Sequence, residues 1–184
     1  MKILTFSGKA ESGKDTTASI FKEKIFKNYN KKSLIIHEAD YLKYICKQYF
    51  GWDGNKDERG RGILQFVGTE IVRIQKKCPN FWVDTISYFM SVFEDDYDYF
   101  LIPDVRYENE ISVLQNDFNF NVLTLNIERP YHENSLTLEQ RNHPSENALD
   151  DYHFDYGIVN LEGLENLEKE VDILINWMKE DNYL

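Results

Sequence analysis

The first residues with a clear chemical signature run from Gly8 to Thr16 and read G-K-A-E-S-G-K-D-T. Glycines near both ends of this stretch let the backbone curl so that its N–H groups converge on one point. Lys14 adds a charge that can reach the outer phosphates of a nucleoside triphosphate, and a helix beginning here adds the positive potential of its N-terminus. The G-x4-G-K pattern therefore predicts a phosphate-binding loop rather than a glycine-rich turn with an exposed lysine.

The residue after this lysine departs from the usual pattern. Ser or Thr normally follows, but this chain has Asp15, and a hydroxyl comes one residue later at Thr16. A carboxylate beside phosphates is repulsive, so we expect Asp15 to point away unless Mg²⁺ or a role as a base compensates. We assign the hydroxyl role to Thr16.

A second acidic residue follows the apolar run Phe100–Pro103. Asp104 comes directly after it, as expected where the C-terminal end of a strand meets Mg²⁺ or its water shell, and Arg106 lies two residues further on. Pro103 is awkward in a central strand because it donates no hydrogen bond to the sheet. Acidic residues after strands are common, so this segment alone also allows a purely structural Asp104.

These residues need a scaffold that brings strand ends together. Short apolar runs alternate with helical periodicity, which predicts an α/β fold with a parallel sheet covered on both faces. The expected strands are Ile3–Ser7, Ser33–His37, Phe100–Asp104, Val122–Ile127 and Tyr156–Asn160. The expected helices are Thr16–Tyr29, Asp40–Tyr49, Gly62–Gln75, Phe81–Phe93, Glu108–Asn116 and a closing helix with Leu164, Leu167, Val171, Leu174 and Met178 on one face.

Two segments interrupt the alternation. Residues 38–98 form a helical insertion, and residues 128–151 form a polar, proline-containing loop that is too long for an ordinary connection. Loops of this length in compact domains are usually lids or disordered segments. The sequence contains no internal repeat and no linker, so we expect residues 1–184 to form one domain.

Composition excludes several classes of protein. The 184 residues carry 21 Lys and Arg against 32 Asp and Glu, a net charge of -11, which disfavours nucleic acid and anionic membranes as partners. Cys46 and Cys78 make no disulfide framework, and the four histidines lack zinc-site spacings. No apolar run approaches the ~20 residues of a membrane span, and the start of the chain lacks a signal peptide. We therefore expect a cytoplasmic protein.

Six stretches, in order along nearly the whole chain, together resemble the phage-type deoxynucleoside monophosphate kinases, P-loop relatives of adenylate kinase. The stretches are Ser12–Ala18, Ala39–Lys43, Leu64–Glu70, Asp104–Glu110, His143–Glu146 and Phe154–Asn160. The resemblance implies a three-layer P-loop NTPase fold with a five-stranded parallel sheet in the order 2-3-1-4-5. It also implies that residues 38–98 bind the monophosphate and that residues 128–151 form a lid. Such kinases commonly read G-K-G-T in the loop, with the hydroxyl at the offset of Thr16.

The implied reaction transfers the γ-phosphoryl group of ATP to a deoxynucleoside 5′-monophosphate, with Mg²⁺ as cofactor, for DNA precursor synthesis. The catalytic candidates are Lys14, Asp104, Arg106, Arg129 and Arg141. The ATP-binding candidates are Gly8, Lys9, Ser12, Gly13, Lys14, Asp15, Thr16 and Thr17. The monophosphate-binding candidates are Asp40, Lys43, Arg61, Gln65, Arg73 and Arg106. Thr16 and Asp104 are the candidates for Mg²⁺, directly or through water.

Each of these assignments has a plainer alternative. Arg129 and Arg141 could be surface residues paired with acids, and Tyr44, Trp52, Phe66 and Trp82 could be core residues instead of stacking on a base. For the whole protein, the alternatives are a P-loop kinase acting on a nucleoside or a phosphomevalonate-like metabolite, and a non-catalytic nucleotide-binding module. A nucleoside kinase would need a carboxylate base, whereas a monophosphate already presents an anionic nucleophile. The sequence leaves open the base, the sugar preference, the role of His143, and whether the protein is a homodimer in the cytoplasm of a phage host.

Overall fold

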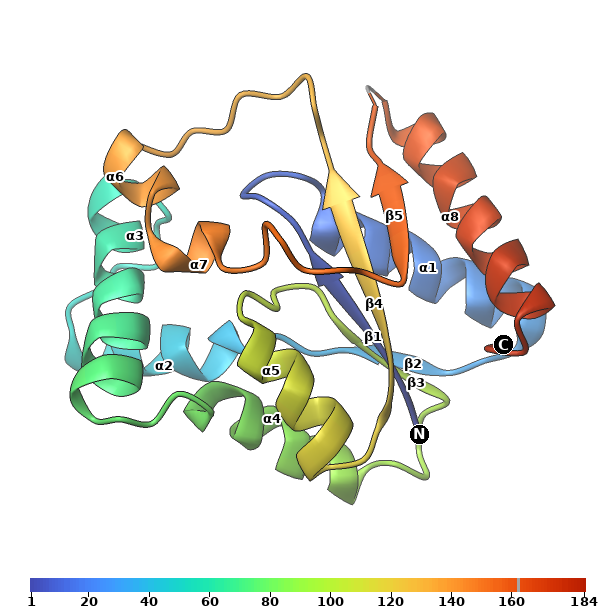
Figure 1. The fold of residues 1–184 in the computed structure, drawn as a ribbon, viewed down its shortest axis with the longest axis horizontal. Helices are drawn as coiled ribbons and strands as arrows, with labels where there is room; N and C mark the ends of the chain where they lie inside the picture. The colour runs from blue at the N-terminus through green and yellow to red at the C-terminus, as the bar shows by residue number, and fades with distance from the viewer. Residues whose placement is uncertain (162) are drawn as a thin grey trace.

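The computed structural model describes residues 1–161 and 163–184, and a five-stranded parallel sheet lies at its centre (Figure 1). The strand order is β2-β3-β1-β4-β5, which confirms the expected 2-3-1-4-5 arrangement. The strands are β1 (Lys2–Ser7), β2 (Ser33–Ile35), β3 (Tyr99–Ile102), β4 (Asn121–Glu128) and β5 (Tyr156–Val159). All the strand pairs are parallel, so the C-terminal ends of the strands share one edge of the sheet.

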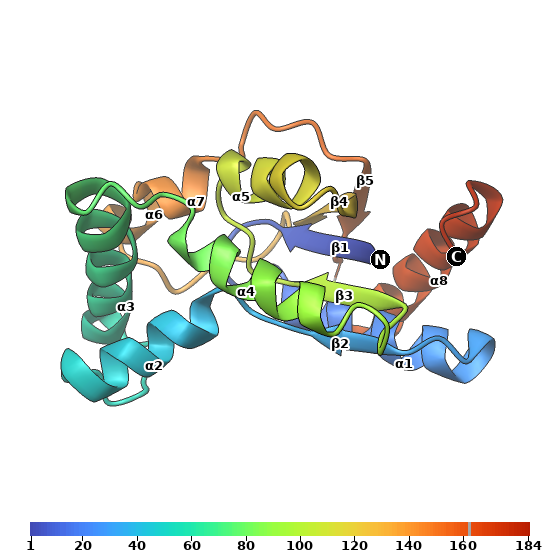
Figure 2. The ribbon, with the colours of Figure 1, turned by 90° about the horizontal axis from the view of Figure 1, so that it is seen from below.

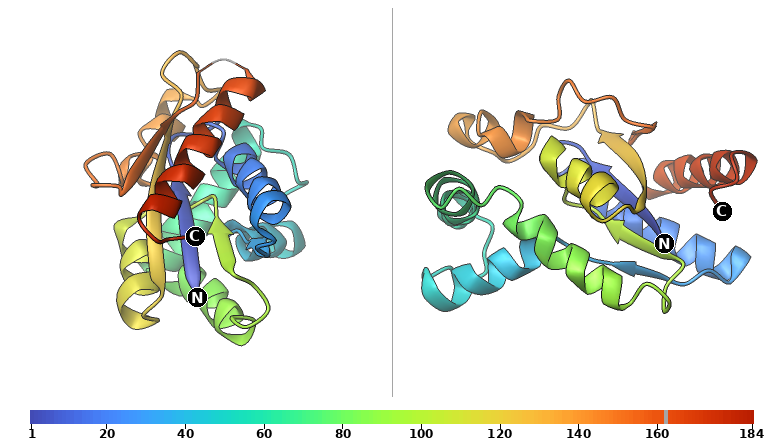
Figure 3. Two further views of the ribbon diagram at one scale, coloured as in Figure 1. Left: turned by 90° about the vertical axis from the view of Figure 1, so that its right-hand side faces the viewer. Right: turned by 60° about the horizontal axis from the view of Figure 1, so that its bottom comes forward.

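Helices cover both faces of the sheet because both faces of its strands are apolar. In β1, Leu4 packs toward α1 (Lys14–Tyr29) and α8 (Leu164–Glu180), while Ile3 packs toward α4 (Phe81–Val92) and α5 (Glu108–Ser112). The left panel of Figure 3 shows α1 and α8 together on one side of the strands. Each helix therefore fixes the end of the strand beside it, and with it the loop that follows.

The insertion is built from α2 (Ala39–Tyr49), α3 (Glu58–Gln65) and a stretch of π-helix, η1 (Phe66–Gln75), that continues α3. Cys46, Trp52 and Val67 form a small core between these elements. Figure 2 shows α2 and α3 beyond the sheet, with α3 beside α6 (Leu138–Arg141) and α7 (Pro144–Asn147). The sequence-based boundaries placed α4 in the same insertion, but its buried face belongs to the core of the sheet.

Three local details differ from the sequence-based expectations. The third strand ends at Ile102, so Pro103 and Asp104 follow the strand, and the missing N–H of proline interrupts no ladder bond. The second strand ends at Ile35, two residues before His37. The segment expected to be a polar loop contains the short helices α6 and α7. Among the described residues, no helix combines the length and apolar character needed to cross a bilayer.

Candidate active site

The phosphate loop lies between β1 and α1 and is held in shape by two glycines. Gly8 has a φ of 136°, and a Cβ atom there would lie 2.3 Å from the main-chain oxygen of Ile127. Gly13 has a φ of 103°, and its Cβ would lie 2.6 Å from Nδ2 of Asn160. That amide donates to the oxygen of Ser12 at 2.7 Å, so the chain after β5 clamps the loop. Glycine is required at both positions because other side chains meet both strain and contact there.

Lys14 begins α1 and turns back over the loop. Its Nζ donates to the main-chain oxygens of Gly8 at 2.8 Å and Lys9 at 2.7 Å. Burial, followed by the charge of Arg106, lowers the pKa of Lys14 to about 7, against the opposing effect of Glu146 and other acids. A buried ammonium group held by two carbonyls is ready to exchange them for phosphate oxygens.

The hydroxyl groups of the loop differ in what they contact. Within residues 1–161 and 163–184, the buried Ser12 hydroxyl has no hydrogen-bond partner, which suits a phosphate oxygen. Thr17 is buried and its hydroxyl donates to the oxygen of Gly13 at 2.9 Å, whereas Thr16 is exposed in the first turn of α1. Of the neighbouring hydroxyls, Thr16 is the more accessible to a metal ion.

Asp15 turns toward the segment that follows β2. Its Oδ1 lies 2.6 Å from Nε2 of His37, and this contact lowers the pKa of Asp15 and raises the pKa of His37. Asp40 lies 3.6 Å from the other ring nitrogen of His37 and 2.7 Å from Nζ of Lys43. The histidine thus offsets the negative charge that Asp15 brings beside the phosphate loop. Sequence reasoning did not single out His37.

Asp104 joins the end of β3 to the start of α2. Its two oxygens accept hydrogen bonds from the N–H groups of Glu38 and Ala39, each at 3.0 Å. This capping role was not predicted. Each carboxylate oxygen keeps a further lone pair for a metal ion or its water. Mg²⁺ is usually held by one or two protein ligands together with phosphates and water, so a lone carboxylate with the Thr16 hydroxyl fits its chemistry.

Arg106 reaches the phosphate loop from the segment after β3. Its Nη1 lies 2.9 Å from Oε1 of Glu146 and 3.4 Å from the main-chain oxygens of Gly8 and Ser145. Lys14 and Arg106 therefore share the carbonyl of Gly8 as a neighbour. This places a donor-side candidate and an acceptor-side candidate at one point of the loop.

A cavity of about 440 Å³ lies between the phosphate loop, the insertion and α5. Its lining includes nine of the residues assigned from the sequence: Lys14, Asp15, Lys43, Arg61, Gln65, Arg73, Trp82, Asp104 and Arg106. The aromatic candidates Tyr44, Trp52 and Phe66 are not in that lining. Trp52 is buried in the core of the insertion, as the plainer alternative required. The cavity brings most of the monophosphate candidates together, next to Lys14.

Arg73 is already engaged at one wall of this cavity. Its guanidinium pairs with Glu110, donates to the main-chain oxygen of Pro79 at 2.5 Å, and lies 4.3 Å from the ring centre of Tyr107. Glu38 is buried beside this group, and burial, followed by the charge of Glu110, raises the pKa of Glu38 well above its usual value. This wall therefore holds the ion pair between Arg73 and Glu110 beside the buried carboxyl group of Glu38, whose charged form burial disfavours.

One set of contacts between residues 128–151 and the phosphate loop centres on Glu11. The Glu11 carboxylate accepts from the hydroxyl of Ser135 at 2.5 Å, lies 3.1 Å from Nε2 of His132, and lies 3.4 Å from the guanidinium of Arg61. Arg129 donates to the main-chain oxygen of Glu11 at 3.3 Å. The phosphate loop, the insertion and the segment after β4 therefore meet at one side chain, which sequence reasoning did not single out.

The other predicted residues of this segment face elsewhere. Arg141 donates to the main-chain oxygens of Leu136 and Asn134, at 3.0 and 2.8 Å, and so stabilises the turn before α6. His143 lies 3.2 Å from a carboxylate oxygen of Glu70 in the insertion.

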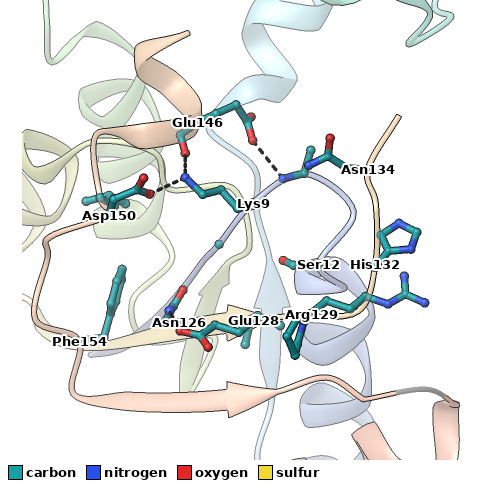
Figure 4. A pocket seen from close by; sticks show the side chains of 15 residues that line it. Lys9, Ser12, Asn126, Glu128, Arg129, His132, Asn134, Glu146, Asp150 and Phe154 are labelled. Atoms are coloured by element: carbon teal, nitrogen blue, oxygen red, sulfur yellow. Dashed lines mark hydrogen bonds and ion pairs between the residues drawn. The ribbon is translucent and has the colours of Figure 1, made fainter. Parts of the chain in front are cut away.

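A second cavity, of about 390 Å³, lies between residues 128–151, β4 and the phosphate loop (Figure 4). Lys9, Ser12 and Arg129 line it. The described part of the chain contains no cluster of three metal-binding side chains.

Comparison with known proteins identifies the family of the chain. The family model described as "Deoxynucleotide monophosphate kinase" matches residues 55–171. The chain belongs to this family. It is also 31% identical, over 112 residues, to the deoxynucleoside-5′-monophosphate kinase of Escherichia phage T5, a match that covers 60% of this chain and 43% of the phage protein. The matched region thus spans less than half the length of that relative.

Solved structures with a similar fold are also kinases. An APS kinase of Mycobacterium tuberculosis superposes with a TM-score of 0.52 and 13% identity, covering 95% of this chain and 96% of that chain. A sugar kinase from Janibacter sp. gives a TM-score of 0.51 and 14% identity, covering 97% and 94%. At these identities the likeness establishes the fold alone.

Proposed function

We propose that the protein transfers the γ-phosphoryl group of ATP to a deoxynucleoside 5′-monophosphate, giving ADP and the deoxynucleoside diphosphate. One observation carries the proposal: the side chains of Lys14 and Arg106 both contact the main-chain oxygen of Gly8 in the phosphate loop. Both side chains also line the cavity next to this loop, together with the basic residues Lys43 and Arg61. Family membership supports the same reaction.

The chemistry asks for positioning and charge neutralisation rather than covalent catalysis. Lys14 would bind the donor phosphates and Arg106 the acceptor phosphate or the transferring group. Lys43 and Arg61 line the cavity and would offset the charge of the monophosphate, although the protein as a whole is acidic. The monophosphate supplies its own anionic nucleophile, so no catalytic base is needed.

Mg²⁺ would be held by the Thr16 hydroxyl and, directly or through water, by Asp104. When bound, it would neutralise charge on the phosphates of ATP. In this proposal residues 38–98 bind the monophosphate and residues 128–151 are a lid that excludes water. The expected partners are small nucleotides rather than nucleic acid or membrane, in the host cytoplasm if a phage encodes the protein, and a homodimer is compatible with this function.

The test is an assay of ADP release with deoxynucleoside and ribonucleoside monophosphates, nucleosides and phosphomevalonate as acceptors. We expect turnover with at least one deoxynucleoside monophosphate. Lys14→Ala should reduce that turnover at least ~100-fold because a charge on the transferring phosphates is lost. Lys22→Ala, on the exposed side of the same helix, is the matched control. Turnover confined to nucleosides or phosphomevalonate, or an active Lys14→Ala, would refute the proposal.

The acceptor role of Arg106 predicts a specific kinetic pattern. Arg106→Ala should lower kcat and raise KM for the monophosphate more than KM for ATP, and a KM rise confined to ATP would place Arg106 on the donor side. The lid proposal is tested by hydrogen exchange of residues 128–151 with and without an analogue that joins donor and acceptor. Protection should increase when the analogue binds, and equal protection in both states would contradict a lid.

A further inference from the structure

Glu146 lies where α7, the phosphate loop and Arg106 meet. Its Oε2 accepts from the N–H of Ala10 at 3.0 Å and its Oε1 pairs with Nη1 of Arg106 at 2.9 Å. The side chain is only 8% exposed. We propose that Glu146 is a positioning residue for phosphoryl transfer, holding the Arg106 guanidinium against the phosphate loop. This role rests on the proposed function.

Arg106 needs such a partner because little else orients its guanidinium. Its main-chain N–H is fixed by Glu110 at 2.6 Å, but its other side-chain contacts, to the oxygens of Gly8 and Ser145, are both 3.4 Å long. An arginine side chain has several rotatable bonds, and fixing it in one geometry costs conformational entropy. The ion pair with Glu146 occupies part of the guanidinium, which has five N–H donors, so others remain for a phosphate.

Glu146 can position Arg106 only if α7 itself is fixed, and the phosphate loop does this through Lys9. Nζ of Lys9 donates to the main-chain oxygen of Glu146 at 2.7 Å, to Asn147 at 2.9 Å and to Asp150 at 2.5 Å. Figure 4 shows Lys9 reaching toward Glu146 and Asp150 from the loop. Lys9 thus holds α7, and α7 in turn holds Arg106.

A different role is possible for a carboxylate at this place. It touches a loop N–H and an arginine, which are groups that also bind phosphate, so it could stand in for a phosphate that displaces it on binding. The two roles predict opposite effects. Removing the charge of a displaced anion tightens the binding of polyphosphates, whereas removing a positioning residue leaves that binding similar and slows catalysis.

The test compares Glu146→Gln, Arg106→Ala and the double variant, with Glu139→Gln as matched control because Glu139 is an exposed residue of α6. We expect Glu146→Gln to lower kcat about 10- to 100-fold, because a misplaced charge loses most of its effect. The double variant should be no slower than Arg106→Ala, because Glu146 acts through Arg106. Glu139→Gln should match the wild type. Inorganic tripolyphosphate should bind wild type and Glu146→Gln with dissociation constants within about threefold of each other.

Three results would overturn this role. If the fold-loss of kcat in the double variant equals the product of the losses in the two single variants, Glu146 acts independently of Arg106. Tripolyphosphate binding at least tenfold tighter in Glu146→Gln would identify a displaced anion. Unchanged kcat in a folded Glu146→Gln, confirmed by Glu146→Ala, would show that the ion pair has no catalytic effect. A wild-type protein inactive on every monophosphate would instead refute the proposed function, and this role with it.

Discussion

Lys14 should make nucleotide binding depend on pH above neutrality. Burial lowers its pKa to about 7, so at pH 8 about nine-tenths of the nucleotide-free protein carries a neutral Lys14. Phosphate oxygens placed against Nζ stabilise the ammonium form and raise its pKa again. ADP binding at pH 8 should therefore take up about 0.9 protons per site.

The direction and the size of the pH dependence of ADP binding follow from this difference in the protonation of Lys14. Protons favour the bound state, so affinity is greatest below pH 7 and falls as pH rises, by up to about tenfold per pH unit. Between pH 7.5 and 9.5 the dissociation constant of ADP should rise roughly 50- to 100-fold. The phosphates of ADP, with a second pKa of about 6, contribute little to this slope in that range.

Calorimetric titration with ADP in two buffers of different ionisation enthalpy measures the protons taken up. Lys14→Arg is the matched variant, because its guanidinium keeps the charge and does not titrate in this range. It should bind ADP without proton uptake and with a flat pH profile. Zero uptake by the wild type at pH 8, or the same uptake in Lys14→Arg, would show that this lysine is not the titrating group.

Three further predictions concern stability and are read from urea unfolding. Asp104→Ala should lower the free energy of unfolding by about 1–2 kcal/mol because two N–H groups at the start of α2 lose their acceptors. Asp104→Asn should cost less, because its amide oxygen still accepts one of these hydrogen bonds, and an unchanged free energy of unfolding in Asp104→Ala would mean that the cap is unimportant. Gly8→Ala should lower the free energy of unfolding by at least ~2 kcal/mol, because Gly8 has a positive φ and a Cβ atom there would meet Ile127. Gly62→Ala, with open space around it, should raise the free energy of unfolding by about 0.5–1 kcal/mol. Similar effects of the two substitutions would contradict the strain argument. Phe21→Ala, fully buried under the sheet, should cost about 3–5 kcal/mol, and a loss below ~1 kcal/mol would contradict that packing.

Much of the fold could be predicted from the sequence. Buried parallel strands are short apolar runs, and helices show apolar residues at a spacing of three to four. The strand order came from the family resemblance, since periodicity does not reveal which strands are neighbours. The helices α6 and α7 were missed because four residues are too few to show a helical period. The end of β3 was placed two residues late because hydrophobicity continues through Pro103, whereas hydrogen bonding stops before it.

The site was predictable where its parts are close in sequence. The phosphate loop is such a case, since all its backbone donors lie within a few residues of Lys14. Glu146 contacts Ala10 across 136 positions, and a glutamate in a polar segment gives no local sign of that contact. The capping role of Asp104 was hidden for another reason: its partners are main-chain N–H groups, which every residue except proline has.

The position of β1 at the centre of the sheet has a consequence for folding during synthesis. Its neighbours are β3 and β4, while β2, the next strand along the chain, is an edge strand that pairs with β3. The ribosome must therefore make about a hundred residues, including the whole insertion, before β1 meets its first partner. At ~5–20 residues per second, β1 stays unpaired for at least several seconds with both edges exposed. A lower growth temperature, or chaperones that cover apolar strands, should therefore raise the soluble yield of this protein. The increase should be larger than for a protein built from β-hairpins, whose neighbouring strands pair soon after synthesis.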